Sequence, residues 1–200
     1  MRKYELTDET KTCFGRTLHR IKALVDFGCI KSGEIGGWIE KEDNLSQYGD
    51  AWVSGDARVF GYARVFGDAR VYGNACVFGD AWVYDNARVF DNARVYGDAK
   101  VSGNAQVSGN AWVSGNAQVA AKECIFWIGA IGSRNGTTTF FNCADGKIRV
   151  SCGCFYGDLE EFAEAVNKTH GDNEYGQVYR IAIEMAKKRI HTVREEVKND

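Results

Sequence analysis

The sequence predicts a mainly β protein, in which a parallel β-solenoid carries a smaller α+β module at its C-terminal end. Residues 48–119 divide into twelve consecutive hexapeptides, and such self-similarity at a fixed period is the signature of a repeat fold. The chain has 23 glycines and no proline among its 200 residues, as expected if most backbone N–H groups bond to a neighbouring strand. Beyond the repeat, Asn-Gly and Asp-Gly pairs separate apolar runs and predict hairpins. We therefore divide the chain into a cap, a solenoid and a C-terminal module, over residues 1–33, 34–121 and 122–200.

The hexapeptides have a nearly invariant pattern. All twelve have Ala fourth and Val sixth, ten have Gly second, and eleven have Asp or Asn third; the exceptions are Asp85, Asp91 and Tyr62. Because Ala and Val alternate with polar or aromatic residues, they share one face of a short strand. The Gly-Asp/Asn pair falls where the chain turns, since glycine, and to a lesser extent Asn and Asp, tolerates positive φ. Three hexapeptides in each coil of 18 residues give four coils.

The residues before the repeat keep its rhythm loosely. Ile39 and Leu45 follow the six-residue spacing in phase with Ala51, which predicts a degenerate first coil and a total of four to five coils. The remaining N-terminal residues are interpreted as a cap of short strands, such as residues 17–25, because a solenoid must cover its open ends.

The C-terminal module is predicted to be a three-strand meander followed by two helices. The strands are expected over residues 125–131, 137–143 and 147–155, with Asn135-Gly136 and Asp145-Gly146 at the turns between them.

The two helices follow from their capping and apolar patterns. Asp158 followed by Glu161 has the spacing of a capping box, and Gly171 marks a helix end. The second helix is expected over residues 175–197. The predicted apolar stripes are Leu159, Phe162, Ala163 and Val166 on the first helix, and Val178, Ile181, Met185, Ile190 and Val193 on the second.

Composition excludes several classes of protein. Hydrophobic residues at 44% exclude a disordered polar chain, and a net charge of −2 gives no general attraction to nucleic acid or anionic membrane. Seven cysteines without a disulfide-framework spacing indicate a reducing compartment. The start MRKYELTDET lacks an apolar signal core, and no run of about 18 apolar residues occurs. We expect a cytoplasmic protein without a membrane partner.

The V-x-G-[D/N]-A-x register resembles the hexapeptide repeat of left-handed parallel β-helix proteins. This resemblance implies a triangular, left-handed solenoid, although many of those repeats place glycine one position earlier. A right-handed, pentapeptide-type solenoid is the alternative, but its period of five does not fit. The segments GGWIEKEDNLSQ, IGSRNGTTTF and VSCGCFYGDLEEF also resemble hexapeptide-repeat proteins of bacteriophages and prophages, a group from which no established activity transfers.

Catalysis is not expected. Hexapeptide-repeat acyltransferases generally need a histidine base projecting from the coils, whereas His19, His170 and His191 all lie outside the hexapeptides. We predict a protein that is not an enzyme and needs no cofactor, with a degenerate acyltransferase-like enzyme as the alternative.

The outward positions of the coils carry aromatic and arginine residues that stacked coils would align. Such ladders can stabilise the sheet by stacking on themselves, or can form a homo-oligomer interface, since exposed aromatic patches often mark one. Related β-helices commonly form trimers, which favours a trimer here, while the acidic corners argue against nucleic acid. The interface candidates are Phe60, Phe66, Tyr72, Phe78, Tyr84, Phe90, Arg70 and Arg88.

A second candidate site lies at the first hairpin of the module. Arg134 could hold a phosphate while nearby hydroxyl and N–H groups add donors, although the same residues also suit a plain Asn-Gly hairpin. The candidate ligand residues are Ser133, Arg134, Asn135, Thr137 and Thr138.

A set of cysteines and one histidine in the module could hold zinc. It lacks the short C-x2-C spacing typical of zinc sites, so buried core thiols are the preferred interpretation. A catalytic pair of Cys154 and His170 is the remaining alternative. The set comprises Cys143, Cys152, Cys154 and His170.

The predicted function is a non-enzymatic, oligomeric scaffold that presents its C-terminal module to a ligand or a host protein. The phage-like resemblance suggests that it inhibits a host immune factor or sequesters a signalling nucleotide in the bacterial cytoplasm.

Overall fold

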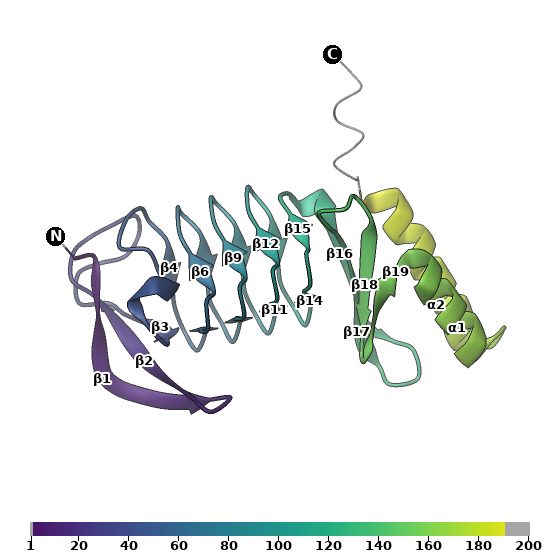
Figure 1. The fold of residues 1–200 in the computed structure, drawn as a ribbon, viewed down its shortest axis with the longest axis horizontal. Coiled ribbons are helices and arrows are strands. Elements are labelled where there is room, and N and C mark those ends of the chain that lie inside the picture. Colours follow the sequence, from purple (N-terminus) through teal and green to yellow (C-terminus); the bar gives the residue numbers. More distant parts are fainter. Residues whose placement is uncertain (1, 191–200) are drawn as a thin grey trace, which may run out of the picture.

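The computed structural model describes residues 2–190 and shows three consecutive parts along one long axis (Figure 1). A curved N-terminal hairpin lies at one end, the stacked coils of a parallel β-solenoid follow, and a sheet with two helices closes the other end. The predicted mainly β architecture is confirmed. The left-handed sense of the coils stays a prediction.

The solenoid forms because each hexapeptide contributes one two-residue strand and one corner. Each hexapeptide Val from Val53 to Val101 pairs with the Val that lies 18 residues later, for example Val59 with Val77, so three hexapeptides make one coil. Three parallel sheets result, in the orders β3-β5-β8-β11-β14, β4-β7-β10-β13 and β6-β9-β12-β15. The strands are β4 (Trp52–Val53), β5 (Arg58–Val59), β6 (Arg64–Val65), β7 (Arg70–Val71), β8 (Cys76–Val77), β9 (Trp82–Val83), β10 (Arg88–Val89), β11 (Arg94–Val95), β12 (Lys100–Val101), β13 (Gln106–Val107), β14 (Trp112–Val113) and β15 (Gln118–Val119).

The interior of the solenoid is filled by the repeated small residues. The Ala and Val of all twelve hexapeptides are 0–1% exposed, as the alternating pattern predicts. Outside the interior, backbone N–H groups donate to the next coil, as from Arg58 N to Ala75 O at 2.9 Å. A proline at such a position would lose this bond, which accounts for the absence of proline.

The backbone at the corners explains why the second position of the hexapeptide is glycine in ten repeats and aspartate in the other two. Gly97 has φ +70°, and a Cβ there would lie 3.0 Å from the backbone nitrogen of Gly115 in the next coil. Asp85 and Asp91 adopt the same positive φ, at 56° and 58°. Their carboxylates accept hydrogen bonds from the N–H groups of Gly103 and Gly109, each at 3.1 Å. These two aspartates thus gain a contact between coils that glycine cannot make.

The degenerate first coil is present, but its register differs from the prediction. Ile39, in β3 (Ile35–Ile39), pairs with Val59, and Leu45 pairs with Val65. Both residues therefore occupy the Val position of the repeat, and not the Ala position that their phase with Ala51 predicted. The spacing to the next coil is twenty residues here, because two extra residues lie between Leu45 and Val53. The short helix η1 (Glu42–Asn44) lies in this coil.

The N-terminal cap consists of two long strands instead of several short ones. Strands β1 (Tyr4–Cys13) and β2 (Arg16–Ala23) form an antiparallel hairpin that continues the sheet of β3. Tyr4 is fully buried, and its hydroxyl donates to the carbonyl of Leu45 at 2.7 Å. Lys3 donates to the carbonyl of Ala51 at 2.9 Å, and burial lowers the pKa of Lys3 to about 8. The start of the hairpin therefore satisfies carbonyl groups at the open end of the solenoid.

The described part of the module contains four strands, one more than predicted. The strands β16 (Ile125–Ile131), β17 (Gly136–Asn142), β18 (Ile148–Cys152) and β19 (Phe155–Asp158) form an antiparallel sheet in chain order. The predicted third strand is interrupted at Gly153, whose φ of 60° starts a tight turn. The 3-10 helix η2 (Lys122–Cys124) connects the solenoid to this sheet.

One face of this sheet closes the far end of the solenoid. Phe141 is buried in the same core as the Ala and Val of the coils. The backbone N–H of Trp112 donates to Thr139 Oγ1 at 3.1 Å, and that of Ala144 donates to the carbonyl of Asn116. The module is thus joined to the last coil by both apolar and polar contacts.

The other face of the sheet packs against the two helices. Helix α1 (Leu159–His170) begins at the predicted capping box, in which Asp158 accepts from Glu161 N at 3.0 Å, and ends at Gly171. Its predicted apolar stripe lies in the second core. Helix α2 (Glu174–Arg189) buries a face that differs from the predicted one. The residues that it buries are Gly176, Tyr179, Ala182, Ile183 and Ala186, and Ile190 follows them at the C-cap.

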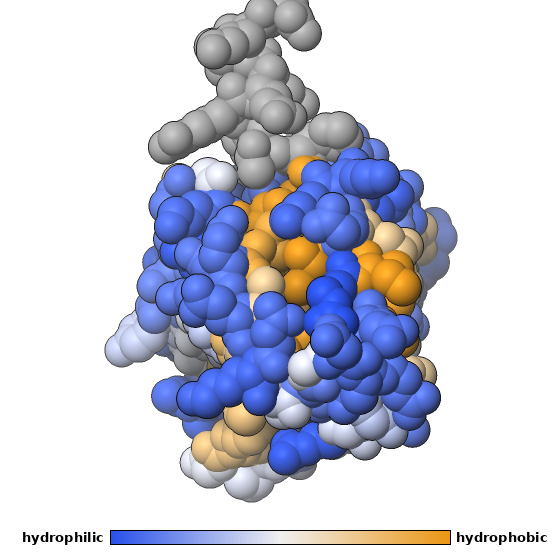
Figure 2. Space-filling model, turned by 90° about the vertical axis from the view of Figure 1, so that its right-hand side faces the viewer, coloured by the Kyte–Doolittle hydropathy of each residue, from blue (hydrophilic) through white to orange (hydrophobic). Residues whose placement is uncertain are grey.

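The predicted apolar side of α2 is wrong for three of its residues, whereas Ile190 is buried as predicted. Val178, Ile181 and Met185 are 38%, 61% and 45% exposed. Figure 2, which views this end of the molecule, shows an apolar area among hydrophilic side chains. The sequence offers two apolar sides on this helix, and the one with small alanines fits closely against the sheet. Val193 lies outside the described residues.

Candidate functional site

The five predicted ligand residues of the first hairpin do not form one site. Two of them line one hollow, two line another hollow, and the fifth is buried in the core. Ser133 and Arg134 line a hollow beside the helices, which we call the aromatic pocket. Asn135 and Thr137 line a second hollow beside the solenoid, which we call the junction groove. Thr138 is fully buried, and its hydroxyl donates to Cys152 Sγ at 3.1 Å. Thr138 therefore does not belong to a surface cluster with the other four.

The aromatic pocket has a volume of about 280 Å³ and combines rings with one cation. The turn after β16 supplies Arg134, while the helices supply rings, among them His170 stacked on Tyr179 at 5.6 Å between centroids. A side chain at Gly132 would collide with the Tyr179 hydroxyl, so this glycine allows the turn to lie against the helix. The principal lining residues are Ser133, Arg134, Cys154, Phe155, His170 and Tyr179.

The electrostatics of the aromatic pocket favour an anion. Arg134 is exposed, and none of the described residues that line the pocket carries a carboxylate. Burial and a contact with Cys152 raise the pKa of Tyr179 to about 12, so its hydroxyl is neutral at physiological pH. Neutral hydroxyl groups, aromatic faces and one guanidinium are suited to binding an aromatic organic anion.

The four residues considered as an alternative zinc set are not brought together. Cys143 is buried against the solenoid core, whereas Cys152, Cys154 and His170 line the aromatic pocket. Burial raises the pKa of the Cys143 thiol to about 11, which disfavours the thiolate that a metal requires. Within residues 2–190, no three His, Cys, Asp or Glu side chains are grouped to hold a metal.

The interpretation of Cys154 as a core thiol is wrong, because the turn at Gly153 exposes it. Cys154 and His170 line the same pocket, but no hydrogen bond joins them in the part of the chain that the structure describes. The arrangement that activates a cysteine nucleophile, a base within hydrogen-bond reach, is therefore not formed there.

The aromatic ladders stack within the chain, as one of the two interpretations predicted. Phe66 stacks on Tyr84 and Tyr72 on Phe90, with centroids 5.0 and 4.9 Å apart and rings within 4° of parallel. Arg70 and Arg88 lie on the outer face of the sheet that contains β7 and β10, Arg70 half-buried and Arg88 exposed.

The third ladder runs through Phe60, Phe78 and Tyr96, and the N-terminal hairpin covers its first two rings. Phe60 is only 4% exposed and stacks on Phe78 at 5.2 Å. Phe14, at the hairpin tip, contacts both rings, at 5.9 and 6.3 Å. Phe60 is therefore unavailable to a partner on this face, and the prediction missed the hairpin because no repeat signal places it there.

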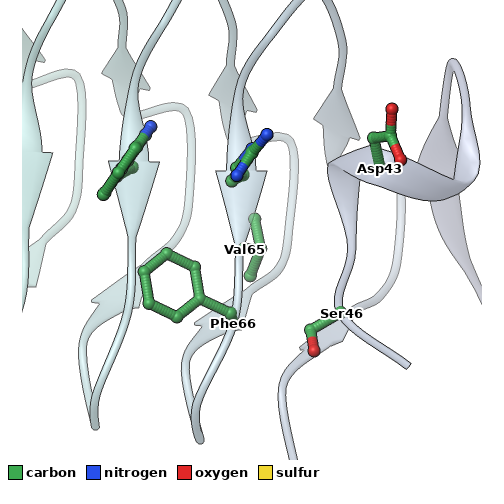
Figure 3. A pocket seen from close by; sticks show the side chains of 6 residues that line it. Asp43, Ser46, Val65 and Phe66 are labelled. Carbon is green, nitrogen blue, oxygen red and sulfur yellow. The ribbon is translucent and has the colours of Figure 1, made fainter. Parts of the chain in front are cut away.

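A further hollow, of about 350 Å³, lies beside the degenerate first coil (Figure 3). Asp43 and Ser46 come from this coil, and Val65 and Phe66 come from the next one. Asp43 and Arg64 line it with opposite charges, so the hollow favours neither a cation nor an anion.

Comparison with known families supports the repeat. A model described as YdcK beta solenoid repeat matches residues 63–77, 69–85, 81–97, 87–103 and 105–120. The chain is a β-helix repeat protein. A comparison with curated proteins found no match. Over residues 2–190, no helix of this β-helix protein is both long and apolar enough to cross a membrane.

Proposed function

We propose that this β-helix protein is a non-enzymatic scaffold whose C-terminal module binds a small aromatic anion, such as a nucleotide, in the aromatic pocket. The observation that carries the proposal is the placement of Arg134 at a hollow walled by His170, Tyr179 and Phe155, without a carboxylate among the described lining residues. A guanidinium can bind a phosphate with two parallel hydrogen bonds, and aromatic rings can stack on a base.

The test is binding of mononucleotides, cyclic nucleotides and acyl-CoA to the whole chain, measured by calorimetry. We expect a nucleotide to bind, and Arg134→Ala to weaken its binding about tenfold or more, because a hydrogen bond to a charged group contributes about 1.5–3 kcal/mol. Arg189→Ala is the control, since this exposed arginine ends α2 and lies outside the aromatic pocket. Equal affinities in the two variants would contradict the proposal.

The same experiment addresses the alternative enzyme. A degenerate acyltransferase would bind acyl-CoA and release free CoA in the presence of an acceptor. The coils carry no histidine to act as the base, so we expect no turnover. Release of CoA at a rate above that of buffer would favour the enzyme.

We further propose that the scaffold is a homo-oligomer, with a trimer favoured by the resemblance to β-helix proteins that form trimers. The stacked pairs Phe66–Tyr84 and Tyr72–Phe90 are half-buried in the single chain, and their remaining exposed surface supports a role in subunit contact. Light scattering at micromolar concentration checks this. A strict monomer would contradict it, and we expect Tyr72→Ser to lower the oligomeric mass.

The biological setting is inferred from sequence resemblance to phage and prophage proteins. In that setting the ligand is a signalling nucleotide of the bacterial cytoplasm, or the partner is a host immune protein. Mass analysis of molecules that co-purify from a bacterial host tests this part, and recovery of neither class would argue against it.

A further inference from the structure

The junction groove is the second hollow that the first hairpin of the module helps to form. It lies between the turn that joins β16 to β17 and the outer face of the last two coils, and has a volume of about 390 Å³. Pockets that hold small ligands usually have volumes of about 300–1,000 Å³. Its principal lining residues are Asn92, Arg94, Asn110 and Trp112 from the coils, and Asn135 and Thr137 from the module.

Arg94 gives the groove its charge. It is the one charged side chain among the described lining residues, and no ion pair occupies its guanidinium in the described part of the chain. The guanidinium lies over the Trp112 ring, with Cζ 4.8 Å from the ring centroid. The tryptophan thus orients the guanidinium by stacking, and leaves its N–H groups available for an anion.

The rest of the groove is polar and neutral. Asn92 and Asn110 occupy equivalent corner positions in successive coils, while Asn135 and Thr137 face them from the module. Ser151 adds a second hydroxyl. Amide and hydroxyl groups both donate and accept hydrogen bonds, as the hydroxyl groups of a sugar do.

The groove offers little to an aromatic base. Its tryptophan already has one face covered by Arg94, and the other principal lining side chains carry amide or hydroxyl groups. This distinguishes the junction groove from the aromatic pocket on the other side of the same turn, where Phe155, Phe162 and Tyr179 supply rings.

We propose that the junction groove binds an acidic saccharide, that is, a sugar unit that carries a carboxylate, sulfate or phosphate group. The anionic group pairs with Arg94, and the sugar hydroxyls bond to Asn92, Asn110 and Thr137. Neither part of the molecule forms this site alone, because the solenoid supplies the cation and the module supplies the opposite wall. The groove adjoins the aromatic pocket at Gly136 and Gly153, but its charged and hydrogen-bonding side chains are different ones, so this proposal does not depend on nucleotide binding.

The experiment is a titration of the full chain, by calorimetry, with glucuronate, glucose 6-sulfate, glucose 6-phosphate, glucose and inorganic phosphate. We expect at least one acidic sugar to bind about tenfold or more tightly than both glucose and inorganic phosphate. The affinity should fall as salt is added, because the ion pair is near the surface. No binding of any acidic sugar at millimolar concentration, or equal binding of inorganic phosphate, overturns the proposal.

Variants locate the site. Arg94→Gln should weaken binding of the acidic sugar about tenfold, and Arg94→Lys should restore part of it because the charge returns without the bidentate geometry. Lys100→Gln is the matched control, since Lys100 holds the same repeat position on another sheet and also lies over a tryptophan, Trp82, at 5.2 Å. An unchanged affinity in Arg94→Gln, or an equal loss in Lys100→Gln, overturns the assignment.

The Arg134→Ala variant separates the two proposals. It should leave acidic-sugar binding unchanged while it weakens nucleotide binding. If Arg134→Ala abolishes sugar binding and Arg94→Gln does not, the sugar occupies the aromatic pocket and the junction groove is not its site. Thermal melting of each variant shows that the fold is kept.

Discussion

The solenoid and the C-terminal module bury their apolar residues in opposite ways. The hexapeptides repeat the same small pair, Ala and Val, at 0–1% exposure. The interior of the solenoid is therefore filled by identical small side chains that stack from coil to coil. The module instead packs large rings such as Phe140 and Phe162 between a sheet and two helices. The hollows described above lie at the degenerate first coil, at the junction and in the module. The first two of these hollows thus lie where a regular coil meets a segment that departs from the repeat.

The largest effect is expected from a charge inside the coils. Val101 is 0% exposed, and Val101→Asp places a carboxylate where no polar partner can reach it. We expect a loss of more than about 4 kcal/mol in the free energy of unfolding, or failure to fold.

The neighbouring residue provides the comparison. Lys100 is exposed on the outer face of the same strand, so Lys100→Gln should change the stability by less than about 1 kcal/mol. Urea denaturation measures both. Similar losses for the two variants would mean that the interior of the coil is not as rigidly packed as the structure indicates.

In the module, a smaller effect should distinguish the two apolar sides of α2. Ile183 is 4% exposed, and Ile183→Ala should cost about 2–4 kcal/mol because it leaves a cavity. Ile181 is 61% exposed, so Ile181→Ala should cost less than about 1 kcal/mol. Thermal unfolding of the two variants measures this difference, and a reversed order would restore the side predicted from the sequence.

The smallest effect concerns the corners. Asp91→Ala removes the hydrogen bond to Gly109 while it keeps a side chain at positive φ, and should cost about 1–2 kcal/mol. Asp91→Gly loses the same bond but relieves the backbone, so its cost should be closer to zero. Chemical denaturation compares them. If Asp91→Gly is the worse variant, the backbone strain that it relieves is smaller than the entropy that glycine adds to the unfolded chain.

The repeat allowed the solenoid to be predicted residue by residue. Six-residue periodicity determines which side chains point inward, and it correctly placed every Ala and every Val of the hexapeptides in the interior. Local signals in the module were equally informative where they act over a few residues, as at the capping box of Asp158 and Glu161.

What the sequence could not predict depends on contacts between distant segments. The extra turn at Gly153 and the buried side of α2 are decided by how the sheet and helices fit together. The two-residue shift after Leu45 cannot be seen in a weakly patterned coil. The candidate sites were only partly predicted, since no local pattern links Arg94 to Asn135, which lie in different parts of the chain and meet only at the junction.

The pairing of each Val with the Val 18 residues later also determines the relative direction of the two ends. Adding or removing a single hexapeptide would turn everything that follows by a third of a revolution about the solenoid axis. A change before Asn92 would turn the last two coils and the module together, so the junction groove would keep its side chains and only its direction relative to the N-terminal hairpin would change. Only a change by a whole coil of three hexapeptides would lengthen the molecule while keeping both ends aligned. The number of hexapeptides therefore determines the angle, about the solenoid axis, between the module and the N-terminal hairpin.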